Sequence, residues 1–216
     1  METHDEWKPQ AVVLCAGDYP THEIPLRMLH KAGRVVCCDG AASEYIRREG
    51  RLPWLVVGDG DSLPLQTKEE LGQRFLHIPE QETNDQTKAT RTLYGQGIRR
   101  VAYVGATGRR EDHTLGNISL LADYHRMGMD VRMYTDHGVF MAPIAHPDGH
   151  RRLQCTVAPG SQLSVFSFGD GPIRAEGVRY PLPERLSAWW QGTLNEATSP
   201  HLSFEAMIPF LVYLAY

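Results

Sequence analysis

The chain has 216 residues, of which 42% are hydrophobic and 22% are charged, and its formal net charge at pH 7 is −4. These values are typical of a globular protein with one or two domains. The acidic balance argues against a general nucleic-acid-binding protein, which would carry a basic surface. The longest apolar run, near the C-terminus, is about half the length that a membrane-spanning helix requires. We therefore expect neither nucleic acid nor a membrane as a partner.

The cysteines and the N-terminus indicate a cytoplasmic protein. None of the four cysteines forms a C-x-x-C pair, and three of them lie in apolar runs, where buried free thiols are common. The N-terminal stretch is charged and has no apolar core, so we expect no signal peptide. A reducing compartment fits this pattern best.

The first 135 residues alternate between short apolar runs and segments with helical character. The runs are rich in Val, Leu and aromatic residues, which predicts strands buried on both faces. Between them, Gly50 is typical of a helix end, Pro64 of a helix start, and Thr83 or Asn84 of an N-cap. The predicted strands are 11–16, 34–38, 54–57, 75–79, 100–104 and 130–134. This alternation predicts a doubly wound, mostly parallel, Rossmann-like α/β sheet.

The last predicted helix of this part begins near His113. Its apolar residues recur at helical spacing, so we expect one buried face formed by Leu115, Ile118, Leu121 and Ala122. After residue 136 the pattern changes to short, partly alternating runs separated by Pro and Gly. That pattern predicts a small all-β sandwich. We expect two domains, residues 1–138 and 150–216.

Acidic residues follow four successive predicted strands. Asp39 follows the second strand, Asp59 and Asp61 follow the third, Asp85 follows the fourth, and Asp112 follows the fifth. In an open parallel sheet, ligands bind beyond the carboxyl ends of the strands, so these residues are expected at one edge. Each acid alone could be a turn residue or a helix cap.

Together, the acids predict a site for a cation. Clustered carboxylates repel one another unless a cation is present, and Mg²⁺ binds carboxylates together with substrate phosphates. Arg109 and Arg110, after the fifth strand, suit bidentate phosphate recognition. The chain lacks the G-x-x-x-x-G-K-[ST] loop, and the first strand-helix turn lacks G-x-G-x-x-G. The sequence therefore predicts a magnesium-nucleotide site outside these two common classes.

Four motifs, in this order, resemble those of the thiamine pyrophosphokinase family. They are C-D-G-A-A (38–42), G-D-G-D-S (58–62), Q-E-T-N-D-Q-T-K-A (81–89) and G-A-T-G-R-R-E-D-H (105–113). In the second part, G-V-R-Y-P-L (177–182) and L-N-E (194–196) are less close matches. The resemblance implies an enzyme that transfers the pyrophosphate of Mg-ATP to the hydroxyl of thiamine, giving thiamine diphosphate and AMP. It also implies an ATP-binding first domain, a thiamine-binding sandwich, and a homodimer with the active site at its interface.

The resemblance also implies roles for individual residues. Asp59, Asp61 and Asp85 are expected to hold Mg²⁺ or to orient the attacking hydroxyl, and either Asp61 or Asp85 could accept its proton. The catalytic set is completed by Arg110 and Asp112. The expected nucleotide-side residues are Asp39, Gly40, Gln81, Asn84, Lys88, Thr107, Arg109 and His113. The expected thiamine-side residues are Asn195 and, for stacking, Trp189 or Trp190, each of which could instead pack in the small domain's core.

Four positions depart from the family pattern. Ala16 precedes Gly17 where Asn-Gly is common, Asn84 stands where Thr is usual, Arg109 replaces a glycine, and Leu194 replaces a serine. None of these changes removes an acid. Two other functions are compatible with the acids: a metal-dependent nucleotide-sugar transferase that uses D-x-D, and a non-catalytic nucleotide sensor. The acids and arginines after the fourth and fifth strands argue against the first. Retention of Asp59, Asp61, Asp85 and Asp112 argues against the second.

Overall fold

The computed structural model describes residues 7–216, which fall into two compact units. Residues 9–120 and 133–136 form one, which we call the α/β unit. Residues 7–8, 121–132 and 137–216 form the other, which we call the β unit. Residues 121–132, expected in the first domain, thus group with the β unit. The expected domain boundaries, residues 1–138 and 150–216, stay a prediction.

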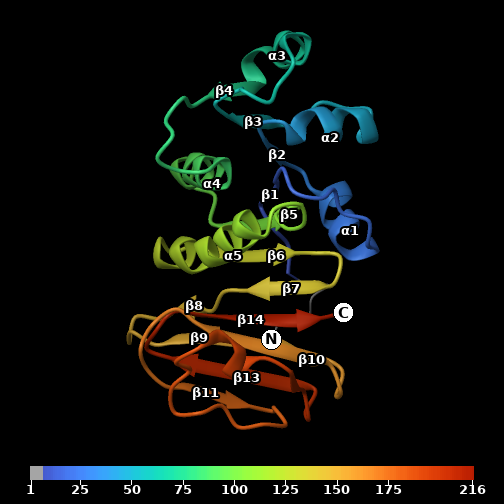
Figure 1. The fold of residues 1–216 in the computed structure, drawn as a ribbon. Helices are drawn as coiled ribbons and strands as arrows, with labels where there is room; N and C mark the ends of the chain where they lie inside the picture. The colour runs from blue at the N-terminus through green and yellow to red at the C-terminus, as the bar shows by residue number, and fades with distance from the viewer. Residues whose placement is uncertain (1–6) are drawn as a thin grey trace. The chain divides into compact units, whose positions relative to one another are not determined.

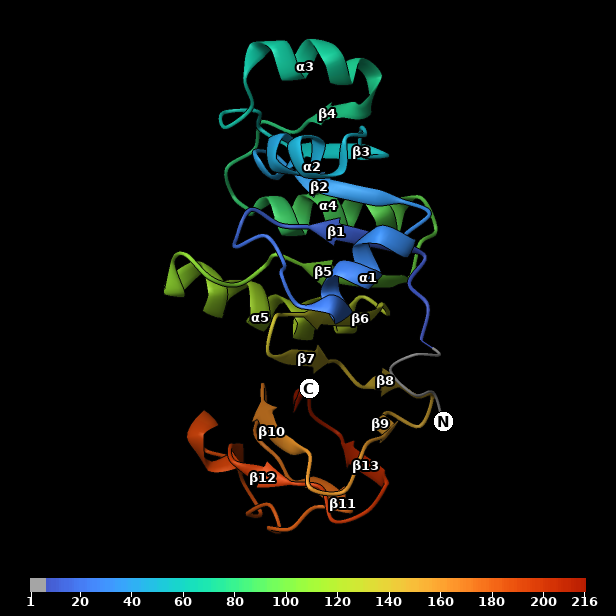
Figure 2. The same cartoon turned by 90° about the vertical axis from the view of Figure 1, so that its right-hand side faces the viewer.

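A parallel sheet is the centre of the α/β unit. Its strands are β1 (Ala11–Leu14), β2 (Val35–Cys38), β3 (Leu55–Gly58), β4 (Phe75–His77) and β5 (Arg100–Val104). Their order in the sheet is β5-β1-β2-β3-β4, and the pairs are parallel. Figure 2 shows these strands in the reverse order from top to bottom, from β4 to β5. All four residues of β1 and of β2 are buried, as the apolar runs predict.

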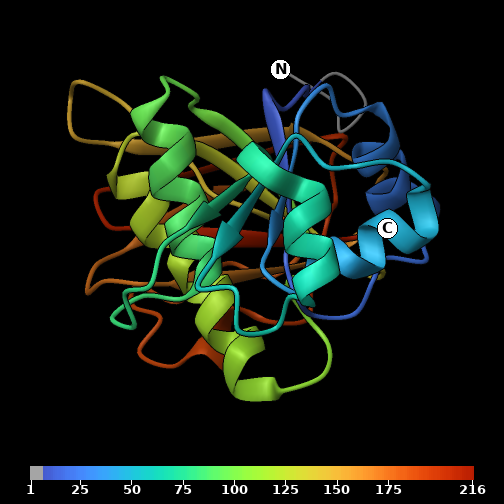
Figure 3. The ribbon, with the colours of Figure 1, turned by 90° about the horizontal axis from the view of Figure 1, so that it is seen from above.

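Helices cover both faces of this sheet. The helices are α1 (Glu23–Lys31), α2 (Ala41–Glu49), α3 (Leu65–Leu71), α4 (Asp85–Gly95) and the first part of α5 (Glu111–Arg126), with a short 3₁₀ turn at Gly72–Arg74. Figures 1 and 3 show α1 and α2 on one side of the strands and α4 on the other. The expected doubly wound α/β fold is confirmed.

Two sets of antiparallel strands make up most of the β unit. One has the order β12-β10-β14-β7, and the other β11-β13-β9-β8. Their strands are β7 (Gly138–Met141), β8 (Ile144–Ala145), β9 (Arg151–Thr156), β10 (Gln162–Ser167), β11 (Ile173–Glu176), β12 (Asn195–Glu196), β13 (His201–Ala206) and β14 (Phe210–Ala215). Every second residue of β10 and β13 is buried, the pattern of strands with one face in a core. The expected small all-β part is confirmed. β6 (Asp130–Tyr134) and a 3₁₀ turn at Trp189–Gly192 complete the elements.

Two details of the sequence-based expectation need correction. The sequence patterns did not predict α1, which begins after His22, whose ring nitrogen accepts from the Ile24 N–H at 3.3 Å. Leu115 is 54% exposed, whereas Leu121 and Ala122 are buried. The prediction of a buried apolar face is therefore wrong for the first turns of α5. The first buried residue of this helix is Leu121.

Within residues 7–216, no helix has both the length and the apolar character needed to cross a membrane. The four cysteines are free and buried.

Candidate active site

A cavity of about 480 Å³ opens at the carboxyl edge of the parallel sheet. Residues that follow β1, β3, β4 and β5 contribute to it, together with Cys38 at the end of β2 and the first turns of α4 and α5. The expected residues that line it are Asp59, Gln81, Asn84, Asp85, Lys88, Arg109, Arg110 and His113. Most of the expected nucleotide-side residues therefore lie at one cavity beyond the strand ends, as the strand order predicted.

Asp59 follows β3 and is fixed by two hydrogen bonds. One carboxylate oxygen accepts from the backbone N–H of Asp61 at 3.0 Å, and the other accepts from Gln81 Nε2 at 2.8 Å. These two bonds lower the pKa of Asp59, so its carboxylate is charged at neutral pH. The tight turn requires Gly60, whose φ is +82°. The turn thus presents a fixed negative charge to the cavity.

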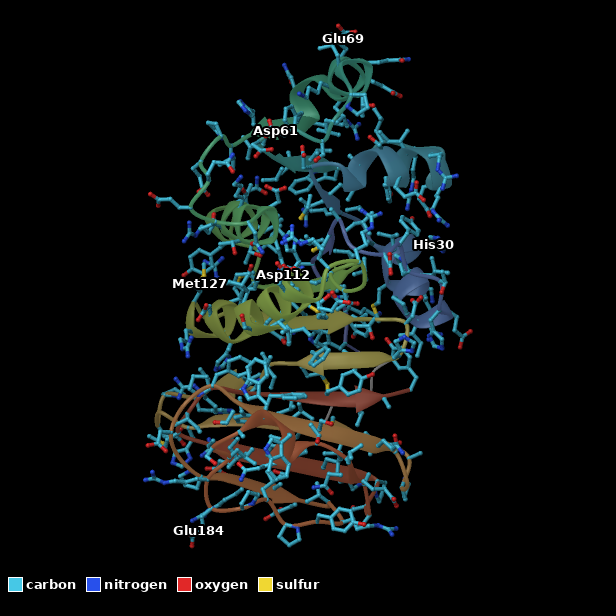
Figure 4. All side chains as sticks on the ribbon, in the orientation of Figure 1. His30, Asp61, Glu69, Asp112, Met127 and Glu184 are labelled. Atoms are coloured by element: carbon cyan, nitrogen blue, oxygen red, sulfur yellow. The ribbon has the colours of Figure 1, made fainter. Side chains whose placement is uncertain are left out.

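Asp61 differs from Asp59 in its surroundings. It is exposed and is not among the residues that line the cavity. Across residues 7–216, no three His, Cys, Asp or Glu side chains are grouped closely enough to hold a metal ion by themselves. Asp59 and Asp85 therefore meet at the cavity while Asp61 stands beside it, on the loop after β3 (Figure 4).

Asp85 begins α4, where Asn84 caps the helix. The Asn84 side chain accepts from the Thr87 N–H at 3.0 Å, and Lys88 Nζ lies 3.2 Å from Asp85 Oδ1. Lys88 is 3% exposed, so this lysine is buried in the wall of the cavity. Burial raises the pKa of Asp85, Lys88 opposes the rise, and the negative charges of Asp39 and Asp59 add to it. The three carboxylates are thus close enough to repel one another.

Asp39 is in a strained turn and is not among the residues that line the cavity. It is 4% exposed and has a φ of +37°, which is uncommon for a residue other than glycine. Its Oδ2 accepts from the Ser62 N–H at 2.9 Å, whereas its buried Oδ1 has no hydrogen-bond partner. A Cβ on Gly58 would lie 2.7 Å from the Cβ of Asp39, so the D-G and G-D-G-D-S turns pack directly together.

Arg110 and Asp112 form a two-bond ion pair at the start of α5. The distances are 3.1 and 2.6 Å, and the pair lowers the pKa of Asp112 to about 2. Arg110 lines the cavity, whereas Asp112 does not. Asp112, labelled in Figure 4, also accepts from the His113 backbone N–H at 2.9 Å. Its contacts orient Arg110 and begin the helix. Thr107 is outside the cavity lining, and its carbonyl accepts from the Asp18 N–H at 2.9 Å.

A second cavity of about 280 Å³ adjoins the first. Both are lined by Cys15, Ala16, Gly17 and Arg109, and the second adds Gly40 and Tyr19. Gly40 is therefore on the smaller cavity rather than the larger one. A Cβ at Gly40 would lie 2.9 Å from the Cβ of Ser62, which explains why this turn holds a glycine.

Among the residues of the larger cavity that were not expected from the sequence, Cys15, Gln86 and Asn117 are joined by hydrogen bonds. Cys15 donates to Gln86 Oε1 at 3.5 Å, and Gln86 Nε2 donates to the Asn117 carbonyl at 3.1 Å. Asn117 Nδ2 donates to the Ala106 carbonyl at 2.8 Å, and its Oδ1 accepts from Asn84 at 3.0 Å. Asn117 stands four residues after His113, so helical spacing could have found it. No comparable signal identifies Cys15 or Gln86.

The expected thiamine-side residues belong to the β unit. Asn195 is 4% exposed, and its side chain bonds the backbone of Tyr180 as donor at 2.7 Å and as acceptor at 3.0 Å. Trp189 is 40% exposed, donates to the Ser167 carbonyl at 3.1 Å, and packs against Phe166 and Phe168. Trp190 is 74% exposed. Trp189 is therefore partly packed against its neighbours, whereas Trp190 is not packed in the core of the β unit.

The chain thus combines a doubly wound α/β unit, with a polar cavity at the carboxyl edge of its sheet, and a small β unit. Residues 26–133 match the family model for the thiamin pyrophosphokinase catalytic domain, and residues 145–213 match that for its substrate-binding domain. The chain belongs to the thiamin pyrophosphokinase family. It is an enzyme that transfers the pyrophosphate of ATP to thiamine, which decides against the sugar-transferase and sensor alternatives.

Solved structures share the fold at low sequence identity. The thiamine pyrophosphokinase from Bacillus subtilis aligns with a TM-score of 0.72 and 18% identity, over 95% of this chain and 98% of that one. The enzyme from Geobacillus thermodenitrificans gives 0.73 and 19%, over 95% and 97%. That from Candida albicans gives 0.72 and 14%, over 95% and 89%. No curated protein sequence matches the chain significantly.

Proposed function

We propose that the 480 Å³ cavity binds the polyphosphate of Mg-ATP and that Asp59 and Asp85 are its principal metal ligands, with Asp61 beside them. The observation that carries this proposal is the presence of both carboxylates on one cavity together with Lys88 and Arg110. Carboxylate oxygens are the donors that Mg²⁺ prefers, and the unpartnered buried Oδ1 of Asp39 adds a further negative group nearby. The residues present therefore fit the ion. Bound there, it would neutralise charge on the polyphosphate.

The chain's own residues orient the polyphosphate. Arg110, held by two bonds to Asp112, offers a pre-oriented guanidinium to phosphate oxygens. Lys88, Gln81 and His113 complete the polar lining. Positioning and charge neutralisation supply most of the rate in phosphoryl-type transfers, and these groups provide both. We infer an in-line attack of the thiamine hydroxyl on the β-phosphorus, with AMP as the leaving group.

Of the two acids considered as the base, position favours Asp85. It lines the cavity at the first turn of α4, whereas Asp61 is exposed outside the lining. A base must reach the attacking hydroxyl within hydrogen-bond distance, directly or through one water. We therefore propose that Asp85 accepts the proton, through a carboxylate oxygen that is not bound to the ion.

A thiamine-dependent assay of AMP release tests this proposal. The purified protein with ATP, Mg²⁺ and thiamine should release AMP and thiamine diphosphate in equal amounts. Asp59→Asn should lower kcat at least 100-fold, because it removes a metal-binding charge without changing side-chain shape. The exposed Asp123→Asn on α5 is a matched control and should keep wild-type activity. Full activity in Asp59→Asn would contradict the metal assignment.

We further propose that thiamine binds at Trp190 and that the active enzyme is a cytoplasmic homodimer. Trp190, Leu194 and Tyr180 are 74%, 83% and 58% exposed, so the β unit presents several apolar side chains that a second copy and a cationic ring could cover. Asn195, bonded to Tyr180, holds this segment in place. Trp190→Ala should raise the KM for thiamine about tenfold and leave the KM for ATP unchanged. Light scattering should give twice the 24.3 kDa chain mass.

A further inference from the structure

Arg109 has a backbone conformation that favours glycine. Its φ is +58°, and within residues 7–216 only Asp39 and Leu194 share a positive φ without being glycine. The chain thus carries an arginine where the family pattern has a glycine, although a side chain is strained there. Strain of this kind persists where the surroundings compensate for it, and it is concentrated at functional sites.

The side chain of Arg109 connects two loops of the α/β unit. Its Nη1 donates to the Ala16 carbonyl at 3.0 Å, and its Nε lies 3.7 Å from Asp18 Oδ1. Arg109 is on the loop between β5 and α5, and the other two residues are on the loop after β1. Arg109 lines both the 480 Å³ cavity and the 280 Å³ cavity. The guanidinium therefore stands where the two cavities adjoin.

Arg109 is the least firmly paired of the three Lys and Arg side chains that line the larger cavity. Lys88 is buried 3.2 Å from Asp85, and Arg110 makes two bonds to Asp112. The Arg109–Asp18 pair is long, and its side chains are 65% and 71% exposed. Exposed pairs of this kind are weak, so a more highly charged anion can displace Asp18.

We propose that Arg109 is a specificity residue particular to this chain: it leaves Asp18 and binds the polyphosphate of ATP at the junction of the two cavities. This inference rests on the proposed assignment of the larger cavity to ATP. Because AMP lacks the β- and γ-phosphates, Arg109 favours ATP over the product AMP. The retained Asp18 carboxylate competes with the nucleotide for the same guanidinium.

Calorimetric titration with Mg-ATP or AMP, without thiamine, tests the proposal in three variants. Arg109→Gly removes the guanidinium and relieves the backbone strain, so thermal unfolding should occur at the wild-type temperature or above it. Its affinity for ATP should fall about tenfold, and its affinity for AMP less than threefold. Arg109→Lys should lose less affinity than Arg109→Gly, because it keeps the charge. Asp18→Asn, which is isosteric, should keep or increase the affinity for ATP.

The two loops could instead need the Arg109–Asp18 contact only for their structure. In that case Arg109→Gly and Asp18→Asn would both weaken ATP binding and both lower the unfolding temperature, which would overturn the proposal. Unchanged ATP affinity in Arg109→Gly, or an equal loss for AMP, would overturn it too. Since no turnover is measured, the result is distinct from a failure of the proposed activity, which appears as absent AMP release in the wild type.

Discussion

Gly17 shows how closely single residues determine the walls of the site. It lines both cavities, and a Cβ there would lie 2.3 Å from the Thr107 carbonyl oxygen and 2.6 Å from that of Gly105. Both contacts are with backbone, which cannot rotate away as a flexible side chain can. The first strand-helix turn therefore needs a glycine for close approach, although it lacks the dinucleotide fingerprint.

Gly17→Ala should destabilise the protein by about 3 kcal/mol, the usual scale for overpacking in a rigid environment. Chemical denaturation followed by circular dichroism measures the change. Gly33→Ala is the matched control, because a Cβ at Gly33 meets nothing within 4 Å. It should change the free energy of unfolding by less than about 1 kcal/mol. The change should be stabilising, because alanine lowers the conformational entropy of the unfolded chain. Equal stabilities of the two variants would contradict the close-contact account.

At the scale of elements, the N-terminus of α4 joins structure to chemistry. Asn84 caps the helix through Oδ1 and donates to Asn117 through Nδ2, so one side chain fixes the helix that carries Asp85 and connects it to α5. The family's usual threonine could provide the cap but not the amide donor. The asparagine that replaces the usual threonine thus has a specific partner, Asn117.

Asn84→Ala should cost about 1 kcal/mol through the lost cap, and it should raise the KM for ATP because Asp85 and Lys88 move with the first turn. Asn84→Thr should keep most of the stability while losing the bond to Asn117. Denaturant titration and steady-state kinetics on the two variants separate the effects. The cap account fails if alanine and threonine destabilise the protein equally.

Strands were more predictable than helices and loops. Buried parallel strands are continuous apolar runs, so β1, β2, β3 and β5 begin and end within two residues of the predicted runs. The edge strand β4 is located equally well, but it has no buried residue, so the expectation that every strand is buried on both faces is wrong there. Helix α1 was missed because Pro25 interrupts its pattern, although the first turn of a helix tolerates proline. In the first turns of α5, His113 and Asn117 line the cavity, and no residue before Leu121 is buried.

The site was predictable to the extent that the sheet edge determines it. The rule that ligands bind beyond strand ends correctly brought Asp59 and Asp85 together, and the rest could not follow from strand order. Asp61 and Asp112 depend on loop conformation, which directs Asp61 to solvent and uses Asp112 to pair with Arg110. The bonds among Cys15, Gln86 and Asn117 join distant segments, so local patterns carry no trace of them.

For the whole molecule, His125 predicts how stability changes with pH. It is 2% exposed, its Nε2 has no hydrogen-bond partner, and burial lowers its pKa to about 4 from the usual 6.5. Nearby Arg151 and Arg126 add to the lowering, and Asp130 opposes it. The unfolded chain therefore binds a proton between pH 6.5 and 4 that the folded protein does not. Its folded-state pKa being depressed, stability falls as the pH drops through this range.

The free energy of unfolding should lose about 3 kcal/mol through His125 between pH 6.5 and 4. Urea titrations at a series of pH values measure the slope. His125→Gln should flatten it, whereas the exposed His201→Gln should keep the wild-type slope. A slope unaffected by His125→Gln would show that other groups carry the pH dependence.

The proposed function depends on Asp59 and Asp85 binding magnesium and ATP together in one cavity of the α/β unit. The most direct test is calorimetric titration of ATP with and without Mg²⁺ on the wild type, Asp59→Asn, Asp85→Asn and the control Asp123→Asn. We predict that Mg²⁺ strengthens ATP binding at least tenfold in the wild type and in Asp123→Asn, and has less than a twofold effect in the two cavity variants. Magnesium stimulation that persists in both cavity variants would contradict the claim.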